Sequence, residues 1–319
     1  MIPGSTFYSE WHGHTRAHLA ALLPHLRGSS SAGAARRLII LAGDSTLDNK
    51  AWVADAPRLS ACCGVEAALS PANCVPDVAA ALNAECAARG AGGRWACLNA
   101  AVEESLLCGR VRRDGTLALA QDAFAAAALQ PGDVLVASAG GNDVVLAPAL
   151  STVAALAALL LFASDAALQD GSAWGMPTLV TLFRDEFQRY LRALCARARP
   201  ALILACFVYY PSEAGSGWAD AALWMMGYGR NPRRLQAVMR AVYRHATCRI
   251  AVEGVRVQPL PLYAVLDASP SGSGDYVARV EPSAAGGAKI ARAVLDAVFA
   301  AEAGAATAAA EPRASSSAT

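Results

Sequence analysis

Two short polar motifs directly follow apolar runs of the sequence, and both contain residues suited to catalysis. Residues 43–45 (Gly-Asp-Ser) come after the run 37–42, and residues 140–143 (Gly-Gly-Asn-Asp) come after the run 133–138. In a tight turn after a strand, Ser45 can point its hydroxyl into a cleft, and backbone N–H groups at the following helix start can face a developing oxyanion. Asn142 adds an amide donor, and the adjacent glycines let the backbone approach a ligand closely.

The apolar runs predict the strands that must position these motifs. The first run is 37–42 (RLIILA), and four similar runs follow at 95–98, 133–138, 201–209 and 255–260. Continuous apolar runs are typical of strands buried on both faces of a parallel sheet. Helical patterns separate them, for example at 187–195 and after Asn231-Pro232. The alternation predicts a flavodoxin-like three-layer α/β/α sandwich with a five-stranded parallel sheet.

In sheets of this kind, ligands bind beyond the carboxyl ends of the strands. Both motifs leave that edge, so we expect Ser45 and Asn142 to lie close together. Two long connections, 142–178 and 210–231, leave the same edge, where long loops often act as lids. The second connection carries methionine and aromatic residues suited to an apolar binding surface or, alternatively, to a small satellite core: Trp218, Trp224, Met225, Met226 and Tyr228.

The two motifs together resemble those of the SGNH (GDSL-type) hydrolases, and the resemblance spans about residues 37–300. That family has Gly-Asp-Ser after the first strand, Gly-x-Asn-Asp after the third, and a His-Pro block before the last helix, which residues 280–291 (VEPSAAGGAKIA) resemble. The resemblance implies that Ser45 is the nucleophile and that Asn142 and the Ser45 N–H hold the oxyanion. It also implies supporting roles for the residues beside these two, which are Gly43, Asp44, Gly141 and Asp143.

The sequence departs from the family pattern at two places. The loop 99–105 (NAAVEES) lacks the family's glycine donor, so Ala101 or Glu104 would have to donate its backbone N–H. In the last block, Ala278 and Glu281 stand where the family has the aspartate and histidine of Asp-x-x-His. The resemblance therefore leaves Glu281 as the candidate base, with Asp275 to orient or replace it.

A glutamate base has to overcome its low intrinsic pKa. A free glutamate has a pKa of about 4.3, against about 6.5 for histidine, and a helix start lowers it further. With such a pKa, activity would persist into mildly acidic solution. Burial would raise the pKa and make Glu281 a better base; otherwise Glu281 is a structural anchor of the helix. A histidine from the N-terminal segment, such as His12, is another route to a base.

Composition and charge exclude several other functions. The 319 residues are 55% hydrophobic with a net charge of +1, which is enough for a large core but offers no electrostatic footprint for nucleic acid or an anionic membrane. The number of cysteines is odd, nine, and none of them has CxxC spacing. The N-terminal residues lack the pattern of a signal peptide. Both observations favour a cytoplasmic location. The run 144–163 is too interrupted for a transmembrane helix. His14 and His18 have the spacing of a metal pair, but no third ligand is evident, so we expect neither metal nor nucleotide cofactor.

We expect three segments: an N-terminal amphipathic helix (7–27) and linker in residues 1–36, a hydrolase-like domain at 37–303, and a disordered tail at 304–319. The implied activity is hydrolysis of a small-molecule ester or acyl substrate. Two alternatives remain: a binding protein of the same fold without catalysis, and an acyltransferase that uses the same serine but excludes water. The sequence indicates no particular substrate and no oligomeric state.

Overall fold

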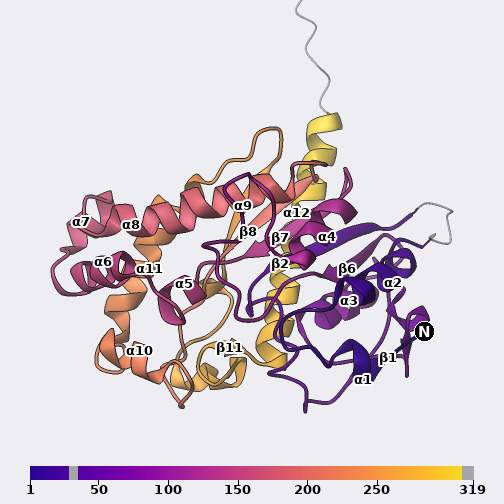
Figure 1. Cartoon of the computed structure of the whole chain (residues 1–319), viewed down its shortest axis with the longest axis horizontal. Helices are drawn as coiled ribbons and strands as arrows, with labels where there is room; N and C mark the ends of the chain where they lie inside the picture. The colour runs from indigo at the N-terminus through magenta and orange to yellow at the C-terminus, as the bar shows by residue number, and fades with distance from the viewer. Residues whose placement is uncertain (29–34, 311–319) are drawn as a thin grey trace, which may run out of the picture.

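The computed structural model describes residues 1–28 and 35–310, and its centre is a five-stranded parallel sheet with strand order β6-β2-β7-β8-β9 (Figure 1). Its strands are β6 (Trp95–Asn99), β2 (Arg37–Gly43), β7 (Val134–Ser138), β8 (Leu202–Phe207) and β9 (Val257–Pro261). Each overlaps one of the five apolar runs, and β6, β7 and β8 are buried along their whole length. The predicted parallel sheet is therefore confirmed.

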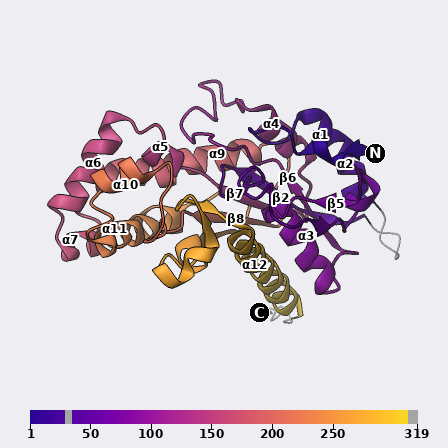
Figure 2. The same ribbon diagram turned by 90° about the horizontal axis from the view of Figure 1, so that it is seen from below.

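Helices cover both faces of the sheet, which makes the expected three layers (Figure 2). One face carries α3 (Val78–Ala88) and α12 (Ala284–Ala310), which pack against each other. The other face carries α2 (Arg16–Arg27), α4 (Ala120–Ala128) and α9 (Phe187–Leu194). The described residues also form three short two-stranded ribbons: β1 (Ile2–Pro3) with β4 (Leu69–Ser70), β3 (Leu59–Ser60) with β5 (Asn73–Cys74), and β10 (Tyr276–Val277) with β11 (Glu281–Pro282).

A further group of helices lies at one end of the molecule, on the left in Figures 1 and 2, and we call it the helical lobe. It consists of α5 (Asn142–Val145), α6 (Leu150–Leu161), α7 (Asp165–Asp170), α8 (Met176–Val180), α10 (Asp220–Met225) and α11 (Pro232–His245). Helix α11 contacts α6, α7 and α8, and α8 continues into α9 through the π-helical stretch Thr181–Glu186. The first long connection, 142–178, is thus largely helical, whereas the second, 210–231, contains the short helix α10 between irregular segments.

The N-terminal segment differs from the expected helix over 7–27. Helix α1 (Gly4–Phe7) ends where that helix should begin, and α2 starts only at Arg16. The start is set by a capping side chain, since Thr15 Oγ1 accepts the backbone N–H of His18 at 3.1 Å. The apolar face of α2 is buried as expected, but residues 8–15 are not helical. Residues 29–34, most of the expected linker, lie outside the described residues.

The C-terminal segment corrects the expected start of the tail. Helix α12 runs through Ala310, so residues 304–310 are helical rather than disordered. Alanine has the highest helix propensity of all residues, which lets a helix continue without an apolar stripe. The remainder of the expected tail, 311–319, lies outside the described residues.

Two further expectations concern the whole chain. Within residues 1–28 and 35–310, no helix is both long enough and apolar enough to cross a membrane. The run 144–163 is divided between α5 and α6 of the helical lobe. All nine cysteines belong to the described part of the chain, and each is a free thiol.

Candidate active site

The turn after β2 and the turn after β7 meet at the carboxyl edge of the sheet, where Ser45 and Asn142 line one pocket. Strands β2 and β7 pair in parallel with Gly43 opposite Ser138, so the residues that follow them leave the sheet side by side. Gly43 has a φ of 131°, and a Cβ there would overlap the Ser138 carbonyl oxygen. Only glycine allows the two turns to come this close.

Asn142 is held in place by the loop 105–108, and one of its amide hydrogens remains available. Its Nδ2 donates to the Ser105 carbonyl oxygen at 3.1 Å, and a primary amide has a second N–H to offer. The neighbouring Asp143 carboxylate accepts the N–H groups of Leu107 and Cys108 at 2.7 and 2.8 Å. These bonds fasten the loop to α5 and orient Asn142. Asp143 thus connects the start of α5 to this loop.

Glu281 lies in the same pocket as Ser45, although the two residues are far apart in the sequence. It belongs to β11, directly before α12, and its side chain is only 2% exposed. Glu281 Oε1 accepts the indole N–H of Trp218 at 3.1 Å. Oε2 has no hydrogen-bond partner among the described residues. The nearby Ser45 hydroxyl lowers the pKa of Glu281.

The electrostatic surroundings make Glu281 more basic than an ordinary glutamate. Burial raises the pKa of Glu281 to about 8, and the negative charges of Asp44 and Glu104 also raise it. The Trp218 indole and the Ser45 hydroxyl act in the opposite direction and lower this pKa. Burial also raises the pKa of Asp44 to about 6, and the nearby Arg110 opposes that rise. The cost of desolvation therefore outweighs the helix start that would make Glu281 more acidic. A carboxylate with this pKa can accept a serine proton near neutral pH.

Asp275 does not lie in the pocket with Ser45 and Glu281. Its carboxylate accepts Lys289 Nζ at 2.6 Å and the Asp267 N–H at 2.9 Å, and it is absent from the pocket lining. The β10–β11 register places Val277 opposite Glu281, so Asp275 lies beyond the paired residues. In this position Asp275 fastens the start of α12, and Trp218 is the side chain that holds Glu281.

The two expected backbone donors of the loop 99–105 differ in availability. The Ala101 N–H donates to Asn99 Oδ1 at 3.0 Å and is therefore occupied. Glu104 has a left-handed φ of 57°, a conformation that favours glycine. Its N–H has no acceptor within the described residues. Glu104 therefore has the backbone conformation of the glycine that the sequence lacks, and it remains the candidate donor of this loop, although it is exposed and is not part of the pocket lining.

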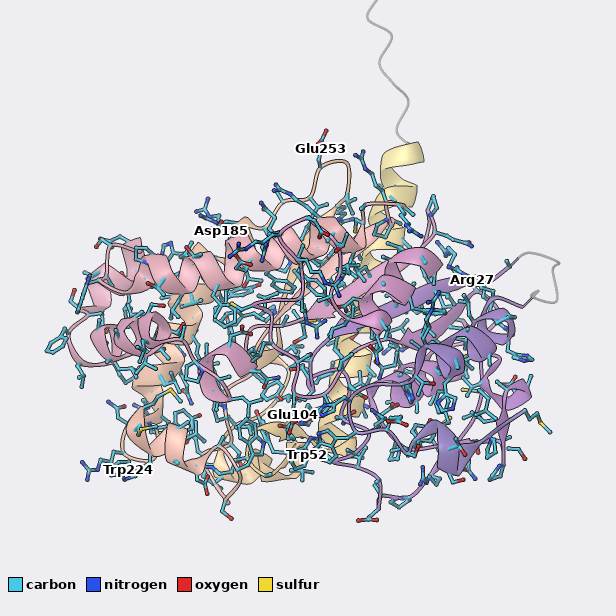
Figure 3. The ribbon with its side chains drawn as sticks, in the orientation of Figure 1. Arg27, Trp52, Glu104, Asp185, Trp224 and Glu253 are labelled. Carbon is cyan, nitrogen blue, oxygen red and sulfur yellow. The ribbon has the colours of Figure 1, made fainter. Side chains whose placement is uncertain are left out.

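A second buried glutamate lies near the site and was not marked by any sequence motif. Glu103 is 2% exposed, and its Oε1 accepts the indole N–H of Trp52 at 3.0 Å. Burial raises the pKa of Glu103 to about 9, and the negative charge of Glu281 raises it as well. Figure 3 shows Trp52 and Glu104 close together in the lower middle of the view. Glu103 is therefore neutral at pH 7, and of the two buried glutamates Glu281 is the one that loses its proton first as pH rises.

Arg110 is a second supporting residue that the sequence did not reveal. It is buried, pairs with Asp122 at 2.9 Å and donates to the Gly43 carbonyl oxygen at 2.5 Å. It also donates to the Ser105 hydroxyl. Arg110 thus connects the turn before Ser45 to the loop that holds Asn142. Its partners are distant in the sequence, so no local pattern could identify it.

Neither His12 nor His14 lies in the pocket with Ser45. His12 Nδ1 lies 3.2 Å from the Glu103 carbonyl oxygen, but His12 is not part of the pocket lining. His14 stacks on Phe7 with 4.1 Å between ring centres, and burial lowers its pKa to about 3. In the described ranges, no group of three or more histidine, cysteine or acidic side chains is arranged to hold a metal ion.

The expected apolar binding surface of residues 210–231 is only partly present in the pocket. Trp218 lines it, but Trp224 and Met225 are 76% and 74% exposed and border a separate depression. Tyr228 is fully buried in a satellite core and donates its hydroxyl to the Pro211 carbonyl oxygen at 2.6 Å. Trp224 and Met225 are exposed because of the orientation of α10: Leu223 faces inward, so the next two residues of the helix point outward. Figure 3 shows Trp224 at the edge of the molecule.

Comparison with known proteins found no matching family model and no matching curated protein. Among solved structures, a protein from Streptococcus pneumonia provisionally described as a platelet activating factor is 9% identical, with a TM-score of 0.39 over 88% of this chain and 92% of that one. A protein from Lactobacillus plantarum is 16% identical, with a TM-score of 0.36 over 86% of this chain and 98% of that one. Both scores are too low for either similarity to support a conclusion about function.

Proposed function

We propose that this protein is a serine hydrolase of the SGNH (GDSL-type) class that acts on an ester or acyl substrate, with Ser45 as nucleophile and Glu281 as base. The observation that carries the proposal is the meeting of these two side chains in one pocket with Asn142. Glu281 is buried there with one carboxylate oxygen free of partners in the described structure. Its pKa of about 8 suits proton exchange with a serine near neutral pH.

In the proposed first step, the Ser45 oxygen attacks the substrate carbonyl carbon while Glu281 Oε2 accepts the serine proton. The carbonyl oxygen becomes an oxyanion, which the second N–H of Asn142 and the backbone N–H groups of Ser45 and Glu104 stabilise. Neither of these backbone groups has an acceptor among the described residues. When the bond to the leaving oxygen breaks, Glu281 returns the proton to that oxygen, and Ser45 carries the acyl group.

In the second step, water attacks the acyl carbon while Glu281 accepts a proton from it. The tetrahedral intermediate collapses, the bond to Ser45 breaks, and Glu281 returns the proton to the Ser45 oxygen. The products are a carboxylic acid and an alcohol, and the protein is regenerated. A single carboxyl group thus acts alternately as base and acid, the two roles that histidine has in the Ser-His-Asp triad.

A fluorophosphonate probe tests this proposal directly, because it reacts only with an activated serine. We expect labelling of one serine, identified as Ser45 by peptide mass spectrometry. The label and ester turnover should both be lost in Ser45→Ala and retained in Ser271→Ala, which changes an exposed serine away from the pocket. Turnover of an ester panel that is unchanged in Ser45→Ala would contradict the assignment.

A catalytically inactive binding protein is the second candidate, favoured by Glu281 in place of histidine and by the engagement of Asp275 with Lys289. For that candidate, the folded protein would bind small molecules in the pocket but would neither react with the probe nor turn over any ester. An acyltransferase would react with the probe and pass its acyl group to an added alcohol in preference to water. Product analysis with and without the alcohol distinguishes transfer from hydrolysis.

A further inference from the structure

Away from its catalytic end, the pocket is walled by apolar side chains of β8 and the helical lobe. Few of its lining residues are polar. The proposed function already uses three of them, which are Ser45, Asn142 and Glu281. Asp44 and Glu281 are the only lining residues with carboxylates, and none of the described lining residues is a lysine, arginine or histidine. A sugar, phosphate or charged group would therefore find no partner beyond the catalytic end.

The apolar wall comes from several elements that converge on one space. Its members include Leu156 of α6, Leu179 of α8, Phe183 of the π-helical stretch, and Val238 and Val242 of α11. All five are buried, yet they border the pocket. Val238 and Val242 are one helical turn apart, so α11 presents a continuous apolar stripe to the pocket.

We propose, on the basis of the hydrolase function proposed above, that this apolar part of the pocket binds the acyl chain of the substrate. The preferred substrates are then esters of medium-length aliphatic or aromatic acids rather than acetyl esters. Each methylene moved from water into such a wall strengthens binding by about fourfold. A chain that fills the pocket therefore gains affinity that an acetyl group cannot.

The acyl half suits this pocket better than the alcohol half for a chemical reason. In a two-step reaction the acyl group stays attached to Ser45 while the alcohol leaves and water replaces it. The half that remains through both steps benefits from an enclosed site, whereas the half that leaves needs a path to solvent. We therefore assign the wall of the helical lobe to the acid component.

A series of p-nitrophenyl esters from acetate to dodecanoate tests the chain assignment. We expect kcat/KM to rise at least tenfold from acetate to hexanoate or octanoate. It should then level off or fall once the acyl chain is longer than the apolar part of the pocket. A matched series keeps the acetyl group and lengthens the alcohol, and it should show no comparable rise. Hydrolysis that is fastest for acetate, or a rise with alcohol length alone, overturns the inference but leaves the hydrolase proposal intact.

Two variants of the wall should change chain preference in opposite directions. Val238→Phe fills part of the pocket and should lower kcat/KM for octanoate relative to acetate by tenfold or more. Leu156→Ala enlarges it and should move the optimum to longer chains. Ala237→Phe is the matched control, because Ala237 is on the same helix but does not line the pocket. Thermal unfolding confirms that each variant is folded, and an unchanged preference in both folded wall variants overturns the inference.

Binding of 1-octanol to Ser45→Ala, measured by calorimetry, tests the pocket without any turnover. We expect binding that Val238→Phe weakens at least tenfold and Ala237→Phe does not. The ligand 1,8-octanediol should bind more weakly, because its second hydroxyl would be buried without a partner. If the protein hydrolyses no ester but binds octanol in this way, the hydrolase proposal fails and the apolar-chain site stands. If octanol does not bind and chain length has no effect on turnover, the site assignment fails.

Discussion

At the scale of single residues, the most informative position is Glu281, which stands where the family has a histidine. Burial and the indole of Trp218 give this carboxylate a surrounding very different from that of a surface glutamate. A raised carboxyl pKa is one physical way to obtain a base of nearly the strength of histidine. The start of α12 next to Glu281 should lower its pKa, but this effect is smaller than that of burial.

The pH dependence of turnover reports which group is the base. With the pKa of Glu281 near 8, kcat/KM should increase from pH 6 to pH 9, since only the carboxylate accepts the serine proton. This reverses the expectation from an ordinary glutamate pKa, for which activity persists into mildly acidic solution. Glu281→Gln should abolish turnover at every pH. A profile that is flat from pH 5 to 9, or normal turnover in Glu281→Gln, would exclude Glu281 as the base.

Asn142 should act mainly on the transition state. Its free amide hydrogen would bind charge that is present only as the oxyanion forms, so Asn142→Ala should lower kcat by about 10²–10³. Its bond to Ser105 is also lost, so circular dichroism and thermal unfolding serve as the folding control. An increase in KM with unchanged kcat would show instead that Asn142 binds substrate and transition state equally.

At the scale of elements, the site depends on the way Arg110 joins the β2 turn to the loop 105–108. The guanidinium reaches the Gly43 carbonyl oxygen, the Ser105 hydroxyl and the Asp122 carboxylate. Tyr190 of α9 donates its hydroxyl to Asp122 at 2.5 Å, so the network also includes the helical layer. One buried ion pair thus fixes the loop that contacts Asn142.

Removal of Arg110 should therefore be costly. Arg110→Met leaves Asp122 buried without its ion-pair partner, and we expect a loss of about 3–5 kcal/mol in the free energy of unfolding, measured with urea. The double variant Arg110→Met with Asp122→Leu should recover part of that loss, because no unpaired charge remains. If the double variant is no more stable than the single variant, the loss arises from packing and not from the isolated charge.

At the scale of the whole molecule, buried acids make stability depend on pH. The pKa values of Glu103 and Glu281 are about 9 and 8, far above those in the unfolded chain. The folded protein therefore holds more protons than the unfolded chain through neutral pH, and its stability falls as pH rises from 7 to 9.

Thermal unfolding at pH 7, 8 and 9 measures this effect. The melting temperature should fall over this range in the wild type, and the fall should be smaller in the double variant Glu103→Gln with Glu281→Gln. Glu85→Gln is a control, because Glu85 lies near the surface, paired with Arg89. A melting temperature that rises from pH 7 to pH 9 would contradict burial of the two carboxyl groups.

Much of this architecture was predictable because it depends on local sequence. The five apolar runs determined the strands, since a strand buried on both faces needs apolar residues without interruption. The edge rule for parallel sheets then brought the turns of Ser45 and Asn142 together. Helix boundaries were less predictable, since Thr15 sets the start of α2 by a side-chain bond and alanine extends α12 without a periodic pattern.

The partners and charge states of the site residues were decided only by the tertiary structure. Trp218 reaches Glu281 across 63 residues of sequence, and Lys289 withdraws Asp275 from the site. Three further features likewise follow from packing: the burial of Glu103 near Glu281, the left-handed backbone of Glu104 and the outward direction of Trp224. The sequence by itself determined the five strands and the edge of the sheet from which the turns of Ser45 and Asn142 leave. Desolvation and hydrogen bonding depend on residues far apart in the chain, so only the folded structure determined which of these groups could do the chemistry.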